Sequence, residues 1–159
     1  MTPSLAPDGR IAMLRHTVAT LAYRGGKALR GAPAEFAGYG SRTPGQILAH
    51  VCDLFDWALT IADGNEAWHN SAPQAWDADI ARFFAGLEAF DRRLASGVPL
   101  SAEPERLFQG PVADALTHVG QIAMLRRMAG CAIGGENYFV AKIETGRVGA
   151  DQAAPVQQF

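Results

Sequence analysis

Apolar side chains recur at the spacing of an α-helix in four long stretches of this chain. No stretch alternates apolar and polar residues as a half-buried strand would. The clearest helical stretch covers residues 75–96, and its apolar face consists of Ile80, Phe83, Leu87, Phe90 and Leu94. The others run from Asp8, which can cap a helix, to about Tyr23, from Thr43 to about Asp63 and from Pro111 to Gly130. This pattern predicts an all-α fold, a four-helix bundle.

Capping residues and glycines indicate where some of these helices begin and end. Thr43 and Gln46 can form a capping box around Pro44, which suits the first helical turn, so a helix is expected to start there. The Gly25-Gly26 pair is expected to end or interrupt the first helix.

The connections between the predicted helices are long. Residues 31–42 are glycine-rich, residues 66–74 are polar but contain Trp68 and His69, and residues 97–110 are expected to form a loop. Connections of this length permit crossovers, so an up-down-up-down order does not follow from the pattern.

The C-terminal part is expected to be less regular. A short helix is expected within residues 138–144, and the polar tail from about Gly146 is expected to be loose. The chain has 159 residues, of which 48% are hydrophobic, and that length suits one domain with a real core. We therefore expect a single domain over residues 1–159.

Charge and composition exclude several classes of partner. The net charge is −2, which argues against nucleic acid or an anionic membrane as a partner. No apolar run approaches the roughly 20 residues of a membrane span, and the first residues lack the pattern of a signal peptide. The cytoplasm is the expected compartment. Cys52 and Cys131 form no Cys-x-x-Cys site and are interpreted as packing residues.

Polar side chains interrupt two of the apolar faces. Asp114, His118 and Gln121 fall within the face of the last long helix, at i, i+4 and i+7, and His50 falls within the face of the second. Burying a carboxylate and an imidazole costs free energy unless each finds a partner. A carboxylate and an imidazole at i, i+4 can reach one ion, and bundles commonly build metal sites from inward-facing ligands. His50, Asp114 and His118 are therefore candidate ligands for Zn, Ni, Mn or Fe(II).

Simpler interpretations stay open at this point. A lone histidine on an apolar face is usually a satisfied core residue, and Asp114 close to a helix start would also interact favourably with the helix dipole. A bundle without metal, in which Asp114 and His118 pair with each other or with another chain, is a further alternative.

Three other side chains could support such a site. Gln121 could donate a hydrogen bond to one of the ligand side chains, or it could serve only as a contact between helices. Asp53, one turn after His50, could orient that imidazole or could be an exposed helix residue. Trp57 could wall a pocket, although core packing is the more common role for a tryptophan.

The residues around these candidates resemble the DinB-like (DinB/YfiT) superfamily. The resemblance rests on Thr43-Pro-Gly-Gln-Ile-Leu-Ala-His50, on Asp114-Ala-Leu-Thr-His-Val-Gly-Gln-Ile122, and on Leu125-Arg-Arg-Met-Ala-Gly130. It implies a metal-binding four-helix bundle, often dimeric, with three ligands and open coordination sites. The common pattern has a histidine where this chain has Asp114. In having a carboxylate at that position, the chain resembles members of the superfamily that are similar to the mycothiol-dependent maleylpyruvate isomerases.

The resemblance also implies a class of chemistry. The superfamily includes thiol-cofactor-dependent transferases and isomerases, together with many members without an established activity. We therefore expect a metal-dependent enzyme acting on a small molecule, with a low-molecular-weight thiol as a cofactor and a homodimer as the assembly. A metal-dependent hydrolase, or a non-catalytic metal-binding or stress-response bundle, is the alternative.

Overall fold

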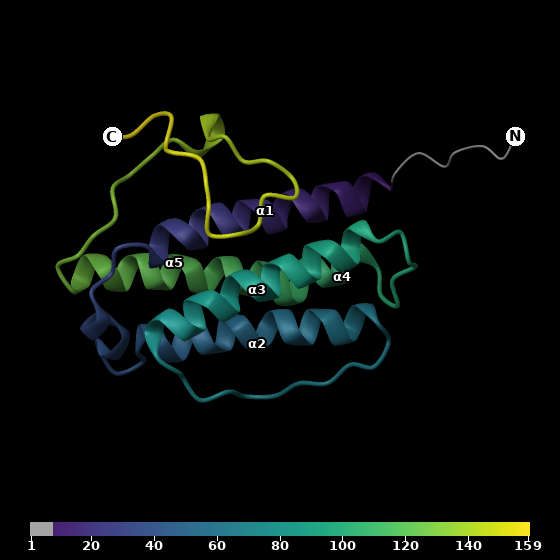
Figure 1. Ribbon diagram of the computed structural model, residues 1–159, viewed down its shortest axis with the longest axis horizontal. Helices are drawn as coiled ribbons and strands as arrows, with labels where there is room; N and C mark the ends of the chain where they lie inside the picture. The colour runs from purple at the N-terminus through teal and green to yellow at the C-terminus, as the bar shows by residue number, and fades with distance from the viewer. Residues whose placement is uncertain (1–7) are drawn as a thin grey trace, which may run out of the picture.

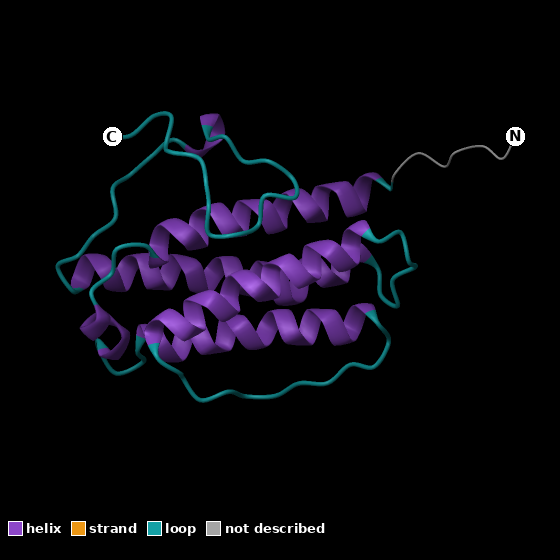
Figure 2. Cartoon of the chain, in the orientation of Figure 1, coloured by secondary structure: helices purple, strands orange, loops and turns teal. Residues whose placement is uncertain are grey.

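The computed structural model describes residues 8–159 and is built from helices, as the sequence predicted (Figure 2). Its elements are α1 (Gly9–Leu29), η1 (Ala34–Gly38), α2 (Pro44–Ala62), α3 (Trp76–Ala95), α4 (Pro104–Leu107), η2 (Phe108–Val112), α5 (Ala113–Met128) and η3 (Tyr138–Val140). The four long helices α1, α2, α3 and α5 lie side by side as a bundle (Figure 1). Large buried side chains such as Phe55, Phe83 and Phe90 fill its core.

The order of the helices brings α2 against α5. Each of α1 and α2 packs on both α3 and α5. Contacts between α2 and α3 advance together along both helices, from Cys52 with Asp79 to Asp63 with Arg93, so the two run parallel. The connection between them must therefore cross back along the bundle, and Figure 1 shows it running along the outside of α2. The long connections do carry a crossover, and α2 and α5 become antiparallel neighbours.

Two predicted helix starts are confirmed. The Thr43 side chain accepts from the Gln46 backbone N–H while the Gln46 side chain accepts from the Thr43 N–H, so the capping box is complete. Asp8 caps α1 by accepting from the Arg10 N–H. Each of these contacts satisfies a backbone donor that the first turn of a helix leaves without a partner.

The predicted break at Gly25-Gly26 is wrong, because α1 continues to Leu29. Both glycines are buried, and a Cβ added at Gly25 would lie 2.6 Å from Cζ of Phe83. The absence of a side chain at Gly25 therefore allows α1 to pack closely against α3. A glycine inside a helix costs only about 1 kcal/mol relative to alanine, which this packing offsets.

The predicted loop before Pro111 is also wrong. Residues from Pro104 onward are helical, and they pass through the π-helical turn η2 into α5. Pro111 lies inside that turn and is buried. A proline has no N–H and its ring clashes with the carbonyl four residues earlier, so a wider i→i+5 turn accommodates it without ending the helix.

The C-terminal region is less helical and better packed than expected. Only Tyr138–Val140 forms a short 3₁₀ helix. The segment after α5 is anchored on α1, since the buried Glu136 carboxylate accepts from the Tyr23 hydroxyl and from Lys27, both at 2.7 Å. The tail from Gly146, expected to be loose, contributes Val148 to the core with 5% exposure. No helix among residues 8–159 is long and apolar enough to cross a membrane.

Candidate metal centre

His50 and the pair Asp114 and His118 meet between α2 and α5. Nε2 of His50 lies 3.2 Å from Oδ2 of Asp114, and Nε2 of His118 lies 3.4 Å from Oδ1 of the same carboxylate. The two imidazole rings meet edge to face with their centroids 4.7 Å apart. One ligand atom from each of the three residues lies within 4.8 Å of the others. The convergence predicted from helical spacing is therefore present in the fold.

Asp114 lies in the middle of a helical run. The run begins at Pro104 and passes through η2, so the backbone at Asp114 continues a helix that is already formed. The favourable interaction of a carboxylate with a helix dipole is confined to the first turn. A role for Asp114 at a helix N-terminus, which the sequence left open, has no structural basis.

Gln121 contacts His118 and sets its orientation, as an acceptor and not as the donor considered from the sequence. Its Oε1 lies 2.7 Å from Nδ1 of His118, one helical turn earlier. An amide oxygen can only accept, so Nδ1 carries the proton of this hydrogen bond. Nε2 of a neutral His118 is then unprotonated and points its lone pair toward Asp114. Metal-ligating histidines commonly use their second nitrogen in this way to fix the tautomer.

This arrangement leaves two electron-rich atoms facing each other. The lone pair of Nε2 in neutral His118 and the carboxylate oxygen Oδ1 of Asp114 are 3.4 Å apart and share no hydrogen. Such a contact is repulsive unless a proton or a metal cation lies between the two atoms. Two imidazole nitrogens and one carboxylate form a donor set that suits Zn, Ni, Mn or Fe(II), so the residues fit a divalent ion.

The centre is open on one side. The side chain of Asp114 is 46% exposed, whereas that of His118 is 10% exposed. Trp68 packs edge to face on His50 with ring centroids 5.6 Å apart, and Trp57 packs on Trp68 at 5.7 Å. The two tryptophans form an aromatic wall along α2, and small molecules can approach Asp114 from solvent.

Trp57 also lines a cavity next to this wall, in agreement with the pocket role considered for it. The cavity has a volume of about 540 Å³ and lies between the end of α2 and the segment from Ser101 to Pro111. A Cβ added at Gly110 would lie 3.8 Å from the Trp57 ring, so the indole covers that glycine closely.

Asp53 does not orient His50, contrary to one of the two roles considered for it, and it is not exposed either. It is 2% exposed and accepts hydrogen bonds from the backbone N–H and hydroxyl of Ser71 and from Nη2 of Arg82, all at 2.7 Å. Its partners therefore belong to the connection after α2 and to α3. The residue holds that connection against the bundle.

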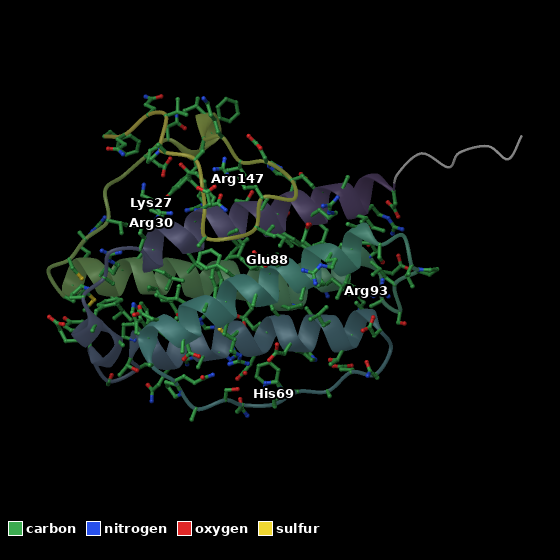
Figure 3. The ribbon with its side chains drawn as sticks, in the orientation of Figure 1. Lys27, Arg30, His69, Glu88, Arg93 and Arg147 are labelled. Atoms are coloured by element: carbon green, nitrogen blue, oxygen red, sulfur yellow. The ribbon has the colours of Figure 1, made fainter. Side chains whose placement is uncertain are left out.

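Asp53, Asp56 and His69 form a second group of potential ligands. The His69 ring lies between the connection and α2 (Figure 3) and contacts both carboxylates. However, Nη2 of Arg82 lies 2.7 Å from an oxygen of each carboxylate. Because Arg82 already supplies a cation at this position, the second group fits a structural ion-pair network better than a metal.

The ionisation of the buried groups follows from these contacts. Burial alone raises the pKa of the Asp53 carboxyl, but the hydrogen bonds from Arg82 and Ser71 outweigh burial, and that pKa lies below its ordinary value. Burial is also the main reason why the pKa of the Cys52 thiol rises to about 12. Cys52 is therefore an inert packing residue, as its sequence context indicated.

Trp68 and the network around Asp53 were not identified from the sequence. Both depend on the connection between α2 and α3, whose path is decided by long-range contacts. The one available signal was a tryptophan and a histidine within an otherwise polar stretch. Such a stretch is expected to contact the bundle rather than to extend into solvent.

Comparison of the chain with known protein families, with curated proteins and with solved structures gave no match.

Proposed function

We propose that the chain is a metal-dependent enzyme that acts on a small molecule, with His50, Asp114 and His118 holding a divalent ion. The observation that carries the proposal is the contact between Nε2 of His118 and Asp114, which lacks a shared hydrogen in the tautomer selected by Gln121. The partial exposure of Asp114 supports a catalytic rather than a closed structural centre, because three protein ligands and an open side leave room for a substrate.

The proposed reaction is a thiol-cofactor-dependent transfer or isomerisation, as the resemblance of the His50 and His118 segments suggests. A divalent ion at this position supplies Lewis acidity and lowers the pKa of a bound thiol or water. Gln121 keeps the ring of His118 in one tautomer, and Trp68 restricts the rotation of His50. These contacts limit the reorganisation of the ligands during a reaction.

Metal analysis tests the proposal directly. Untagged wild-type protein is expected to retain about one equivalent of Zn, Ni, Mn or Fe after dialysis. His50→Ala, Asp114→Ala and His118→Ala are each expected to reduce metal affinity at least tenfold, since loss of supporting contacts alone costs roughly 10–100-fold.

Two controls separate this site from other histidines. His16→Ala removes an exposed histidine of α1, and His69→Ala removes the histidine of the second group, so both variants should retain the metal. A wild-type protein without stoichiometric metal would disprove the site, as would full retention in the three ligand variants.

Activity and stability measurements distinguish an enzyme from a structural bundle. Thiol transfer to electrophilic substrates is expected for the metal-loaded protein and should disappear on chelation. Equal rates before and after chelation would exclude the metal mechanism. A large fall in melting temperature on chelation, without any activity, would instead indicate a structural ion.

A further inference from the structure

The cavity beside Trp57 has an apolar wall and a charged end. Trp57, Ile61 and Pro111 supply the apolar surface, and Arg106 and Gln109 supply polar groups. Glu66 also lines the cavity, but its Oε1 accepts from the Trp57 indole N–H at 3.0 Å and holds that ring in place. Arg106 is the one basic side chain among the lining residues.

Arg106 has no partner of its own within residues 8–159. The acidic residues nearest to it in sequence, Glu103 and Glu105, are both engaged by Arg10, at 2.8 and 3.3 Å. No hydrogen bond or ion pair among the described residues involves the Arg106 guanidinium. A guanidinium presents paired N–H donors that match the two oxygens of a carboxylate.

The cavity and the candidate metal centre share the same two elements. Trp57 follows His50 by seven residues on α2, and Pro111 precedes Asp114 by three residues in the helical run that ends in α5. At about 1.5 Å per residue, the cavity lies roughly 5–10 Å along the bundle from the centre. Trp68 contacts both Trp57 and His50, so one aromatic wall joins the two places.

We infer that this cavity is the substrate subsite of the metal centre and that it takes a small organic carboxylate. Arg106 binds the carboxylate group and Trp57 contacts the apolar body of the same molecule. The inference rests on the proposed function for its link to the metal, whereas binding of the anion depends on Arg106 alone. Glu66 repels an anion from the Trp57 end and so sets the direction in which the molecule lies.

The test is a titration of full-length protein with 3-phenylpropionate, followed through the Trp57 indole N–H signal by NMR. Trp57→Phe assigns the signal. The neutral isostere 3-phenylpropanamide is titrated in parallel. Wild-type protein is expected to bind the acid about tenfold more tightly than the amide, and added salt should reduce this difference.

Three variants test the inference. Arg106→Gln is expected to weaken binding of the acid about tenfold and to leave the amide unchanged. Glu66→Gln keeps an acceptor for the indole N–H and removes the negative charge, so it should tighten binding of the acid. Arg127→Gln removes an exposed arginine of α5 outside the cavity and should have no effect. Equal affinity of wild type and Arg106→Gln for the acid would overturn the inference.

Metal binding is measured on the same samples. Arg106→Gln should retain metal, and the metal-ligand variants should retain 3-phenylpropionate. Wild-type protein that binds 3-phenylpropionate but no metal would therefore count against the proposed function. Wild-type protein that binds metal but binds the acid no better than Arg106→Gln would count against the subsite.

Discussion

At the scale of single residues, Asp114 is the side chain whose contacts most favour a metal ion. Its two oxygens face Nε2 of His50 and of His118, at 3.2 and 3.4 Å. Because Nδ1 of His118 donates to Gln121, Nε2 of a neutral His118 carries no proton. A neutral His118 therefore cannot donate a hydrogen bond to Asp114 through Nε2. Helical spacing alone could not distinguish a ligand from a carboxylate near a helix start.

Asp53 is expected to stabilise the fold in a pH-dependent way. Replacing it with asparagine leaves Arg82 without its buried counter-charge, so Asp53→Asn should lower the free energy of unfolding by about 3 kcal/mol at pH 7. The pKa of Asp53 is depressed in the folded state from 3.8. Its contribution is therefore complete above about pH 4 and is lost as the pH falls through the folded pKa.

Urea denaturation of wild type and Asp53→Asn between pH 2 and 7 checks this prediction. Asp56→Asn is the matched control, since Asp56 binds the same Arg82 nitrogen but its side chain is 40% exposed. It should cost less than 1 kcal/mol. A difference between wild type and Asp53→Asn that persists unchanged at pH 2 would contradict the assignment.

At the scale of elements, two glycines inside helices have opposite roles. A Cβ at Gly25 would meet the buried ring of Phe83 at 2.6 Å, whereas a Cβ at Gly120 has no neighbour within 4 Å. Gly25→Ala should therefore destabilise the protein by roughly 1–3 kcal/mol through overpacking. Gly120→Ala should stabilise it by about 0.5–1 kcal/mol through helix propensity.

Thermal and urea unfolding of the two alanine variants measure this contrast. The substitution and the type of element are the same in both, so intrinsic propensity cancels in the comparison. Stabilisation of similar size in both variants would show that α1 does not approach α3 as closely as Gly25 requires.

At the scale of the whole molecule, the C-terminal tail is predicted to be part of the core. Val148 is 5% exposed, and Val156, eight residues later, is 53% exposed. Val148→Asp buries a charge without a partner and should lower the free energy of unfolding by about 3 kcal/mol or more. Val156→Asp should change it by less than about 0.5 kcal/mol.

Chemical denaturation of both valine variants, with trypsin digestion of the native state, checks the packing of the tail. Val148→Asp should also expose Arg147 to cleavage. Unchanged stability and protease resistance in Val148→Asp would restore the interpretation of a loose tail.

Local interactions were enough to predict the four long helices, their capping at Asp8 and Thr43, and the face on which His50, Asp114 and His118 lie. Each of these depends on residues within one or two helical turns. Local sequence patterns also gave two wrong predictions, a helix break at Gly25 and a loop before Pro111. A glycine used for close packing looks the same in sequence as a helix terminator, and a proline in a π-helical turn looks the same as a helix start.

Only the tertiary structure decided which faces meet. The crossover after α2 places α3 parallel to α2. It leaves α5 as the antiparallel neighbour of α2, on the side where His50 lies. The path of that crossover depends on contacts of Asp53 with Ser71 and Arg82, which are distant in sequence, and it places Trp68 against His50. Helix formation is largely a local property, whereas the juxtaposition of helices depends on loop closure and on packing between distant residues. The sequence by itself therefore identified the three candidate ligands, and the fold supplied their neighbours, their open side and the cavity beside them.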